Sequence, residues 1–280
     1  MSIDTLTIVG VGLIGGSIGL AAKANGVARR VLGVGRDPHS LCKARDAGAI
    51  DEACLDLAAA APRGSLIVLC TPVERIAEQV RTLAAHARPG TIITDAGSTK
   101  AGIVTALDGT LPPGVAFVGS HPLAGSEKRG PEYATANLFT GRVVVVTPTR
   151  HTDPAAVDAV TEFWQALGAR VRRMDPFEHD DALALTSHLP HLAASAVAGV
   201  VPPHLLDLAA TGFRDTTRVA AGDAALWTGI FLSNRGAVLA AAEKLSAWLQ
   251  TFRTALEAGD APALTELLDQ AKRTRDALGR

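Results

Sequence analysis

The strongest constraint on this fold is a glycine-rich stretch close to the start of the chain. Residues 6–9 form a short apolar run typical of a strand, the sequence GVGLIGGS follows at residues 10–17, and a helical pattern comes next. This is the G-x-G-x-x-G pattern in the strand–turn–helix context that a dinucleotide-binding site requires. We expect Gly10 to permit the tight turn, Gly12 to let the backbone approach a pyrophosphate, and Gly15 to let helix and strand pack closely.

The helix that follows this turn offers free N–H groups and a partial positive charge to phosphate oxygens. The alternative is a tight glycine turn that binds no ligand. A polar residue, Thr71, ends a later apolar strand at the rim that would face the cofactor. The predicted cofactor contacts are Gly10, Gly12, Leu13, Ile14, Gly15, Arg36, Asp37 and Thr71.

The end of the second predicted strand, residues 31–34, bears on which cofactor binds. An NAD site usually places an acidic residue here to bind the ribose 2′-hydroxyl, but this strand is followed by Gly35, Arg36 and Asp37. Gly35 leaves room, and the planar guanidinium of Arg36 suits a 2′-phosphate. We therefore favour NADP over NAD. In the competing interpretation, Asp37 turns back to the ribose and Arg36 stacks on the adenine.

Strand and helix patterns alternate up to about residue 174, which predicts an α/β fold with a doubly wound sheet. Further strands are expected at residues 66–70, 91–94, 115–118, 143–146 and 169–172. Polar residues follow two of these strands, with Ser98 after one and the stretch 119–128, which contains His121, after the next. Because ligands bind at the carboxyl ends of such strands, we expect Ser98 and His121 to converge on one crevice.

Beyond residue 174 the strand signals stop and helical periodicity takes over. We therefore predict two domains, a dinucleotide-binding domain at residues 1–174 and an all-helical domain at residues 175–280. The last three helices are expected at residues 224–234, 236–257 and 262–277. Asp223 and Asp260 are the expected N-caps, and Gly259 is expected to end the middle helix.

The first polar cluster of the helical half surrounds two histidines. His188 and His191 are three residues apart and share a helix face, and Asp181, seven residues before His188, is expected on the same stripe. Pro190 should kink the helix. The alternative is a kinked helix whose histidines are satisfied by their neighbours.

The second polar cluster of the helical half contains two arginines. Arg214 and Arg218 are four residues apart, so both point one way, with hydroxyl residues between them. Two guanidinium groups on one face suit a dicarboxylate. The alternative is a pair of surface arginines that form salt bridges with Asp215 or Asp223.

Composition narrows the class of protein. The chain is 48% hydrophobic and 20% charged, which is enough to bury a sizeable core, and its net charge of −1 argues against a nucleic-acid or membrane-surface partner. The 3 cysteines suggest neither a disulfide framework nor a metal site. The N-terminus is a poor signal peptide, and no apolar run is long enough to span a bilayer. We therefore expect a cytoplasmic protein with no bound metal.

The chain resembles the prephenate dehydrogenases of tyrosine biosynthesis, including the arogenate and cyclohexadienyl dehydrogenases. The stretches that carry the resemblance run in family order over nearly the whole chain; they are GVGLIGGS at 10–17, DAGSTK at 95–100, GSHPLAGSE at 119–127, SHLPH at 187–191, GFRDTTR at 212–218 and SNR at 233–235. The third and fourth together are the most specific. The resemblance implies a Rossmann domain, a helical domain that forms a homodimer, and an active site between them. Because the chain ends soon after its last predicted helix and begins just before its first strand, we expect no regulatory amino-acid-binding domain and no fused chorismate mutase.

The activity that the resemblance implies is the NAD(P)-dependent oxidative decarboxylation of prephenate to 4-hydroxyphenylpyruvate. By motif position, His121 would hydrogen-bond the ring hydroxyl and assist its deprotonation, and Ser98 would help to hold both. A neutral histidine suits a base near pH 7. His191 and Arg218 would contact the substrate carboxylates, and His179 would be a supporting residue. The predicted substrate contacts are Ser120, Ser126, Glu127, His188, His191, Arg214 and Arg218.

Three alternatives stay open. Another dehydrogenase of this architecture would place its acid/base residue in the helical domain, whereas here the histidine is in the first domain. A non-catalytic dinucleotide sensor would lack the polar cluster that Ser187, His191 and Arg218 form. Arogenate, or both substrates, could replace prephenate, although His191 resembles the prephenate-using enzymes more.

Overall fold

The computed structural model describes residues 3–126, 128 and 130–279 of the 280-residue chain. The backbone forms two compact units, Met1–Asn234 and Arg235–Arg280. The predicted domain boundary at residue 174, where strands give way to helices, lies inside the first unit and stays a prediction.

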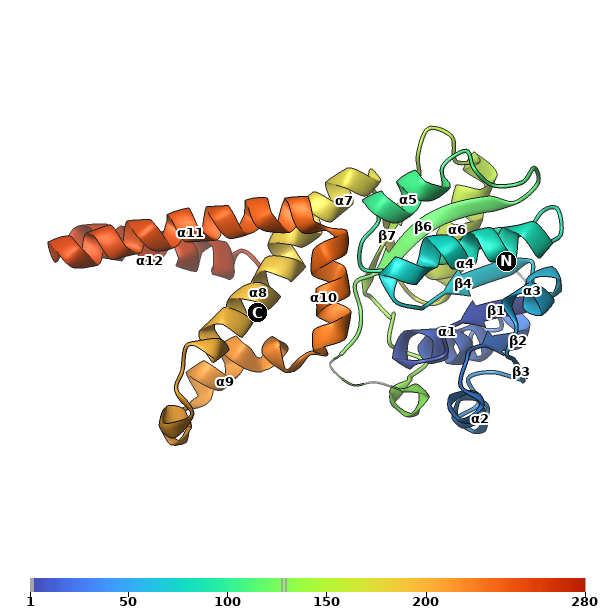
Figure 1. Cartoon of the computed structure of the whole chain (residues 1–280), viewed down its shortest axis with the longest axis horizontal. Coiled ribbons are helices and arrows are strands. Elements are labelled where there is room, and N and C mark those ends of the chain that lie inside the picture. Colours follow the sequence, from blue (N-terminus) through green and yellow to red (C-terminus); the bar gives the residue numbers. More distant parts are fainter. Residues whose placement is uncertain (1–2, 127, 129, 280) are drawn as a thin grey trace. The chain divides into compact units, whose positions relative to one another are not determined.

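The first unit is built on an eight-stranded sheet with the order β3-β2-β1-β4-β5-β6-β7-β8 (Figure 1). The six strands from β3 to β6 pair in parallel. Their order is that of doubly wound dinucleotide-binding folds, with a switch point between β1 and β4. The predicted α/β fold is therefore confirmed. The strands are β1 (Ile3–Val9), β2 (Ala28–Val34), β3 (Glu52–Cys54), β4 (Leu66–Leu69), β5 (Ile92–Asp95), β6 (Ala116–Pro122), β7 (Val143–Thr147) and β8 (Arg170–Arg173).

Helices cover both faces of this sheet. One apolar cluster joins the strands to α1, α2 and α6, and a second joins them to α3, α4 and α5. Central strands are consequently apolar on both sides, and all four residues of β4 are buried. The covering helices are α1 (Leu13–Ala24), α2 (Pro38–Asp46), α3 (Leu57–Ala60), α4 (Val73–His86), α5 (Ala101–Leu107) and α6 (Pro154–Ala166).

Strand β6 extends further than its sequence indicates. The apolar run at 115–118 predicts an end at Val118, but the strand continues through His121 to Pro122. The cause is β7, which pairs antiparallel with this extension, so that residues 119–122 face residues 144–147. His121 is thus on a paired strand rather than in a loop, and its side-chain direction is fixed by the sheet.

The rest of the first unit is helical and packs beside the sheet. It comprises α7 (Pro176–Leu183), a π-helical turn (Ala184–His188), α8 (Leu189–Gly199), a 3-10 helix (Pro203–Leu208), α9 (Thr211–Thr217), a 3-10 turn (Arg218–Ala221) and α10 (Ala224–Ser233). Helix α7 packs against α5, α10 packs against α4, and α8 packs against both α9 and the 3-10 turn. These contacts bring the two polar clusters of the helical half into one unit with the sheet.

The second unit is a pair of packed helices, α11 (Arg235–Ala258) and α12 (Ala261–Asp276) (Figure 1). Gly259 ends α11 with a φ of +62°, and the Asp260 side chain accepts a hydrogen bond from the Ala263 amide at the start of α12. Both predictions are confirmed, as is the cap of α10 by Asp223. Within the described ranges, no helix is both long enough and apolar enough to cross a bilayer.

Candidate active site

The glycine-rich turn has the geometry of a phosphate cradle. Gly10 has a φ of +87°, and a Cβ there would lie 2.8 Å from the carbonyl oxygen of Cys70 at the end of β4. A Cβ on Gly15 would lie 2.3 Å from the carbonyl oxygen of Gly10, so only glycine permits this approach of α1 to the turn. A Cβ on Gly12 would meet nothing within 4 Å, and no side chain caps α1 at Gly12. The start of α1 is therefore neither crowded at Gly12 nor capped by a side chain, which fits a pyrophosphate.

Thr71 lies directly beside this turn. A Cβ on Gly10 would be 3.0 Å from Cγ2 of Thr71, so the carboxyl ends of β1 and β4 adjoin at the switch point. The Thr71 hydroxyl donates to Oε1 of Gln79 at 2.5 Å, which fixes its orientation. The predicted cofactor contacts from these two strand ends are thus brought together.

The end of β2 bears on the cofactor question. The Asp37 side chain caps α2, accepting from the amides of His39 and Ser40 at 3.1 Å each and from the Ser40 hydroxyl at 2.6 Å. These hydrogen bonds, led by the one from the Ser40 hydroxyl, hold the pKa of Asp37 below its ordinary value. Arg36 is exposed and forms no ion pair with any other described residue.

His121 stands at the head of a buried chain of hydrogen-bonding groups. Its Nδ1 is 2.9 Å from Nε2 of His179, and Nδ1 of His179 is 2.8 Å from Oδ1 of Asp180. The exposed fractions of these side chains are small, at 9% for His121, 0% for His179 and 4% for Asp180. Asp180 also accepts hydrogen bonds from the amides of Lys100 at 2.7 Å and Ala101 at 2.9 Å, at the start of α5.

The electrostatic surroundings keep His121 neutral. Burial lowers its pKa well below the ordinary 6.5, and the neighbouring His179, Lys100 and His188 lower it further. A buried imidazole without its proton at neutral pH is able to act as a base.

The loop that follows β6 leads from His121 to the glycine-rich turn. A Cβ on Gly125 would lie 3.8 Å from Cδ1 of Ile14. Two predicted parts of the site, the cofactor turn and the histidine stretch, therefore touch through this loop.

The other predicted residues near His121 have different surroundings. Ser120 is fully buried, and its hydroxyl contacts the carbonyl of Asp95, the hydroxyl of Thr94 and the indole N–H of Trp164. Because side chains alternate along a strand, Ser120 faces away from His121, and we leave it out of the proposed substrate contacts. Ser126 is exposed and accepts from the Lys128 amide at 3.2 Å. Glu127 lies outside the described residues.

Ser98 follows the carboxyl end of β5, as predicted. Its hydroxyl forms no hydrogen bond to another residue in the described part of the chain, His121 included. The turn before it is held by Asp95, whose Oδ2 accepts from the Gly97 amide at 2.9 Å and pairs with the buried ammonium of Lys100. Ser98 is thus placed by a rigid turn.

His188 and His191 lie near each other on α8 and the turn before it. His191 is 5% exposed and stacks on the indole of Trp227. His188 is 1% exposed, and its Nδ1 lies 3.2 Å from Nδ2 of Asn234. Burial lowers the pKa of both rings, that of His188 to about 4. Two ring atoms, Nε2 of His188 and Nδ1 of His191, are buried without a hydrogen-bond partner among the described residues.

Arg214 and Arg218 lie on the segment that packs against α8. Both are exposed, and neither forms an ion pair with another described residue. Two unpaired cations on one exposed segment fit the predicted role as carboxylate anchors.

Three residues of this region were missed or misplaced by the sequence reasoning. Asp181, predicted on the stripe of His188, is exposed, whereas its neighbour Asp180 is buried on that side of the helix. The cause is the π-helical turn, which adds one residue before His188 and so shifts the helix face. Two further residues were not predicted as part of the site: Trp227, which stacks on His191, and Asn234, which donates to the carbonyl of Asp180 at 2.7 Å. Only the SNR stretch signalled Asn234.

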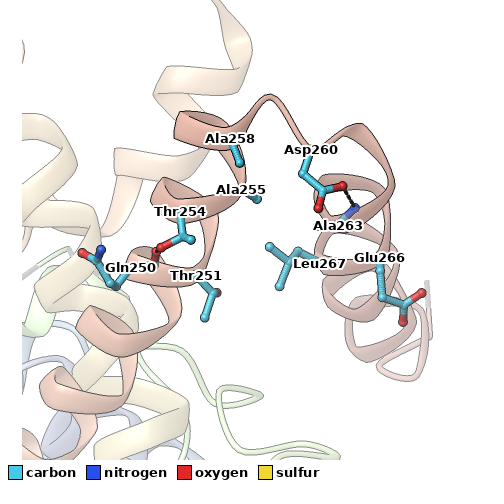
Figure 2. Close-up of a pocket in the computed structure, with 9 residues that line it drawn as sticks. All are labelled: Gln250, Thr251, Thr254, Ala255, Ala258, Asp260, Ala263, Glu266 and Leu267. Carbon is cyan, nitrogen blue, oxygen red and sulfur yellow. Dashed lines mark hydrogen bonds between the residues drawn. The ribbon is translucent and has the colours of Figure 1, made fainter.

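A hollow of about 500 Å³ lies in the second unit between α11 and α12 (Figure 2). Its walls are mostly alanine, threonine and leucine, and its charged residues are Asp260 and Glu266. Two carboxylates disfavour an anionic ligand, so this hollow does not compete with the site around His121.

The class that this fold and site define is a dinucleotide-dependent dehydrogenase, because the glycine-rich turn offers a phosphate cradle and the neutral histidine a proton acceptor. Two family profiles match the chain, "Prephenate dehydrogenase, nucleotide-binding domain" over residues 18–173 and "Prephenate dehydrogenase, dimerization domain" over residues 175–270. The chain belongs to the prephenate dehydrogenase family.

Relatives of known name agree with this family over nearly the full chain. The cyclohexadienyl dehydrogenase of Zymomonas mobilis is 34% identical, over 98% of this chain and 95% of the relative. The prephenate dehydrogenase of Bacillus subtilis is 33% identical, over 98% of this chain and 76% of the relative. The crystal structure of prephenate dehydrogenase from A. aeolicus, in complex with hydroxyphenyl propionate and NAD+, has a TM-score of 0.93 at 33% identity and covers 99% of both chains.

Proposed function

We propose that this chain catalyses the NAD(P)-dependent oxidative decarboxylation of prephenate to 4-hydroxyphenylpyruvate in tyrosine biosynthesis. The observation that carries the proposal is the position of His121. It is buried, its pKa is lowered, and the loop after it touches the glycine-rich turn at Ile14. A proton acceptor is thereby held at the strand ends where the cofactor cradle lies.

The roles of the residues follow from the chemistry. His121 accepts the proton of the ring hydroxyl, and Ser98, on its rigid turn, hydrogen-bonds the same hydroxyl. Arg218 and His191 hold the two carboxylates, with Arg214 nearby, so that the ring carbon is aligned for transfer. A bound nicotinamide supplies the hydride acceptor. The ring becomes aromatic when carbon dioxide leaves, so the protein mainly has to position the reactants.

Within this proposal, NADP is the preferred cofactor. The capping hydrogen bonds of Asp37 engage both of its carboxylate oxygens and hold the side chain at the start of α2, which favours a capping role over a contact with the ribose. Arg36, exposed and without an ion pair to a described residue, is available for a 2′-phosphate.

The proposed organisation is a nucleotide-binding domain at residues 1–174 and a helical domain at residues 175–280 through which two copies pair. The description of the profile that matches residues 175–270 as a dimerization domain supports this. We place the reaction in the cytoplasm.

The test is a spectrophotometric assay of the purified chain with prephenate and either NADP or NAD. Appearance of the reduced cofactor is expected from the wild type. The His121→Asn variant is expected to lose about 10²–10⁴-fold in kcat with little change in KM. A non-catalytic sensor would bind the cofactor without reducing it, and that result would reject the proposal.

A second candidate function is dual use of prephenate and arogenate. The cyclohexadienyl dehydrogenase of Zymomonas mobilis favours it, because it matches nearly the whole of this chain. Arogenate carries an amino group where prephenate has a keto group, so parallel assays with the two substrates separate the candidates. Comparable kcat/KM values would establish dual use.

A further inference from the structure

The hydrogen-bond chain behind His121 has a defined direction, and it begins at Asp180. Both oxygens of this carboxylate accept from backbone amides, Oδ1 from Lys100 and Oδ2 from Ala101. An amide N–H only donates, and it binds best to an ionised carboxylate, which is an acceptor on both oxygens. Asp180 therefore acts towards His179 as a hydrogen-bond acceptor and has no proton to donate.

The tautomer of His179 follows from this contact. Its Nδ1 lies 2.8 Å from Oδ1 of Asp180, so Nδ1 carries the proton and donates it. In a neutral imidazole the other nitrogen then has a lone pair. Nε2 of His179 accordingly accepts from Nδ1 of His121 at 2.9 Å.

The tautomer of His121 is fixed in turn. With its proton on Nδ1, the lone pair of the ring is on Nε2. This Nε2 has no hydrogen-bond partner among the described residues and is not one of the enclosed, unpartnered ring atoms. Of the four ring nitrogens of His179 and His121, it is therefore the one that is available to bind a ligand.

We propose that Asp180 and His179 are positioning residues that hold His121 as its Nδ1–H tautomer, so that Nε2 is the atom that accepts the substrate proton. The proposal rests on the proposed dehydrogenase function. In the step, the O–H bond of the substrate hydroxyl breaks and an N–H bond forms at Nε2. The imidazolium so formed keeps its Nδ1–H on His179, and the negative charge of Asp180 lies at the far end of the same chain.

The test reads the tautomer directly. ¹⁵N-histidine-labelled full-length enzyme is studied by NMR without substrate, and the His121→Asn variant identifies the His121 signals. The wild type is expected to show protonated Nδ1 and unprotonated Nε2 on His121. In Asp180→Asn the amide cannot accept on both atoms, so the tautomer is expected to reverse or mix. The kcat should fall between about tenfold and 10⁴-fold, the loss that a wrong tautomer causes, with KM changed less.

Two sets of variants separate orientation from folding. Asp181→Asn makes the same change one residue away on an exposed side chain and is expected to keep both kcat and tautomer. His179→Gln retains a carbonyl oxygen that can accept from Nδ1 of His121, so it is expected to keep the tautomer and more of the kcat than His179→Leu. This pair tests the proposal even if Asp180→Asn does not fold.

Several outcomes would overturn the proposal. One is a wild-type His121 with its proton on Nε2. Another is an Asp180→Asn variant that is folded by thermal unfolding but keeps the wild-type tautomer, whatever its kcat. A third is equal loss of kcat in His179→Gln and His179→Leu. If the wild type shows the expected tautomer but does not oxidise prephenate, the proposed function fails and the orientation of His121 stands.

Discussion

The imidazole of His191 is stacked on the indole of Trp227, with ring centroids 3.5 Å apart and an angle of 11° between the rings. The two residues come from α8 and α10, which are joined in the chain by the 3-10 helix Pro203–Leu208, α9 and the 3-10 turn. Gly222 packs against both rings and leaves no room for a side chain, because a Cβ there would lie 2.7 Å from Nε1 of Trp227 and 3.0 Å from Cε1 of His191. The stack therefore fixes the plane of a ring that we propose holds a substrate carboxylate.

Removing the stacking partner should weaken substrate binding. Trp227→Leu is expected to raise the KM for prephenate by about two- to tenfold, the equivalent of one aromatic pair, and to leave kcat nearly unchanged. Trp227→Phe keeps a ring and serves as the control, with a KM close to that of the wild type. Steady-state kinetics decides, and a loss confined to kcat in Trp227→Leu would contradict a binding role.

Arg214 and Arg218 should contribute to substrate binding as well. Arg218→Ala is expected to raise the KM for prephenate by about 10–100-fold, the loss of one charged hydrogen-bonded anchor, with a smaller rise for Arg214→Ala. Arg172→Ala removes an exposed arginine from β8 and is the matched control. Equal KM values for Arg218→Ala and Arg172→Ala would show that Arg218 does not bind the substrate.

The cofactor preference can be reversed at the end of β2. Arg36→Ala is expected to raise the KM for NADP by about tenfold or more and to leave that for NAD almost unchanged, because only NADP has the 2′-phosphate. Gly35→Asp should favour NAD, since a carboxylate repels the 2′-phosphate of NADP. The fold should tolerate this substitution, because the new Cβ would be 3.3 Å from Cδ2 of Leu41, a side-chain end that can shift. An Arg36→Ala variant in which the KM values for NADP and NAD rise equally would show that Arg36 does not bind the 2′-phosphate.

Local signals made much of the fold predictable. The caps at Asp223 and Asp260 and the stop at Gly259 depend on a few neighbouring residues, and the observed α10, α11 and α12 match the predicted ranges within two residues. The glycine-rich turn was predictable for the same reason, because its strand, turn and helix are contiguous.

Features that depend on distant pairing were not predictable from the sequence. The extension of β6 through His121 requires β7, more than twenty residues later, to pair antiparallel with it. The π-helical turn that brings in Asp180 leaves no clear signal in the sequence, and the indole of Trp227 has the periodicity of a core residue. Asp180 and Trp227, which orient the histidines of the site, were therefore not predictable from the sequence.

A buried ion pair beneath the site should matter for stability. Lys100 and Asp95 pair at 0% side-chain exposure, and Asp95 also accepts from the Ser120 amide at 3.0 Å. Lys100→Met leaves this carboxylate buried without its cation and is expected to lower the free energy of unfolding by about 3–5 kcal/mol. Lys23→Met, which breaks the half-exposed pair with Asp51, should cost about 1 kcal/mol or less. Urea denaturation measures both, and similar losses would contradict the buried pair's importance.

The pH dependence of stability can be traced to His188. Burial lowers its pKa from the ordinary 6.5 to about 4, partly offset by the charge of Asp180. Nδ2 of Asn234 donates to its Nδ1, a hydrogen bond that a proton on Nδ1 would break. The folded protein therefore disfavours the proton that the unfolded chain accepts.

Between pH 6.5 and about 4 the unfolded chain thus binds more protons at this position than the folded chain, so the free energy of unfolding rises with pH in this window. The contribution of His188 is fully present above pH 6.5 and is lost as the pH falls towards 4, a change of up to about 3 kcal/mol. His121 and His191, whose pKa values are lowered too, act in the same direction. Urea denaturation across the window should show a shallower slope for His188→Gln than for the wild type, and His204→Gln, a change at an exposed histidine, should keep the wild-type slope. An unchanged slope in His188→Gln would mean that the folded protein protonates His188 as readily as the unfolded chain does, and the hydrogen bond from Asn234 would then be assigned wrongly.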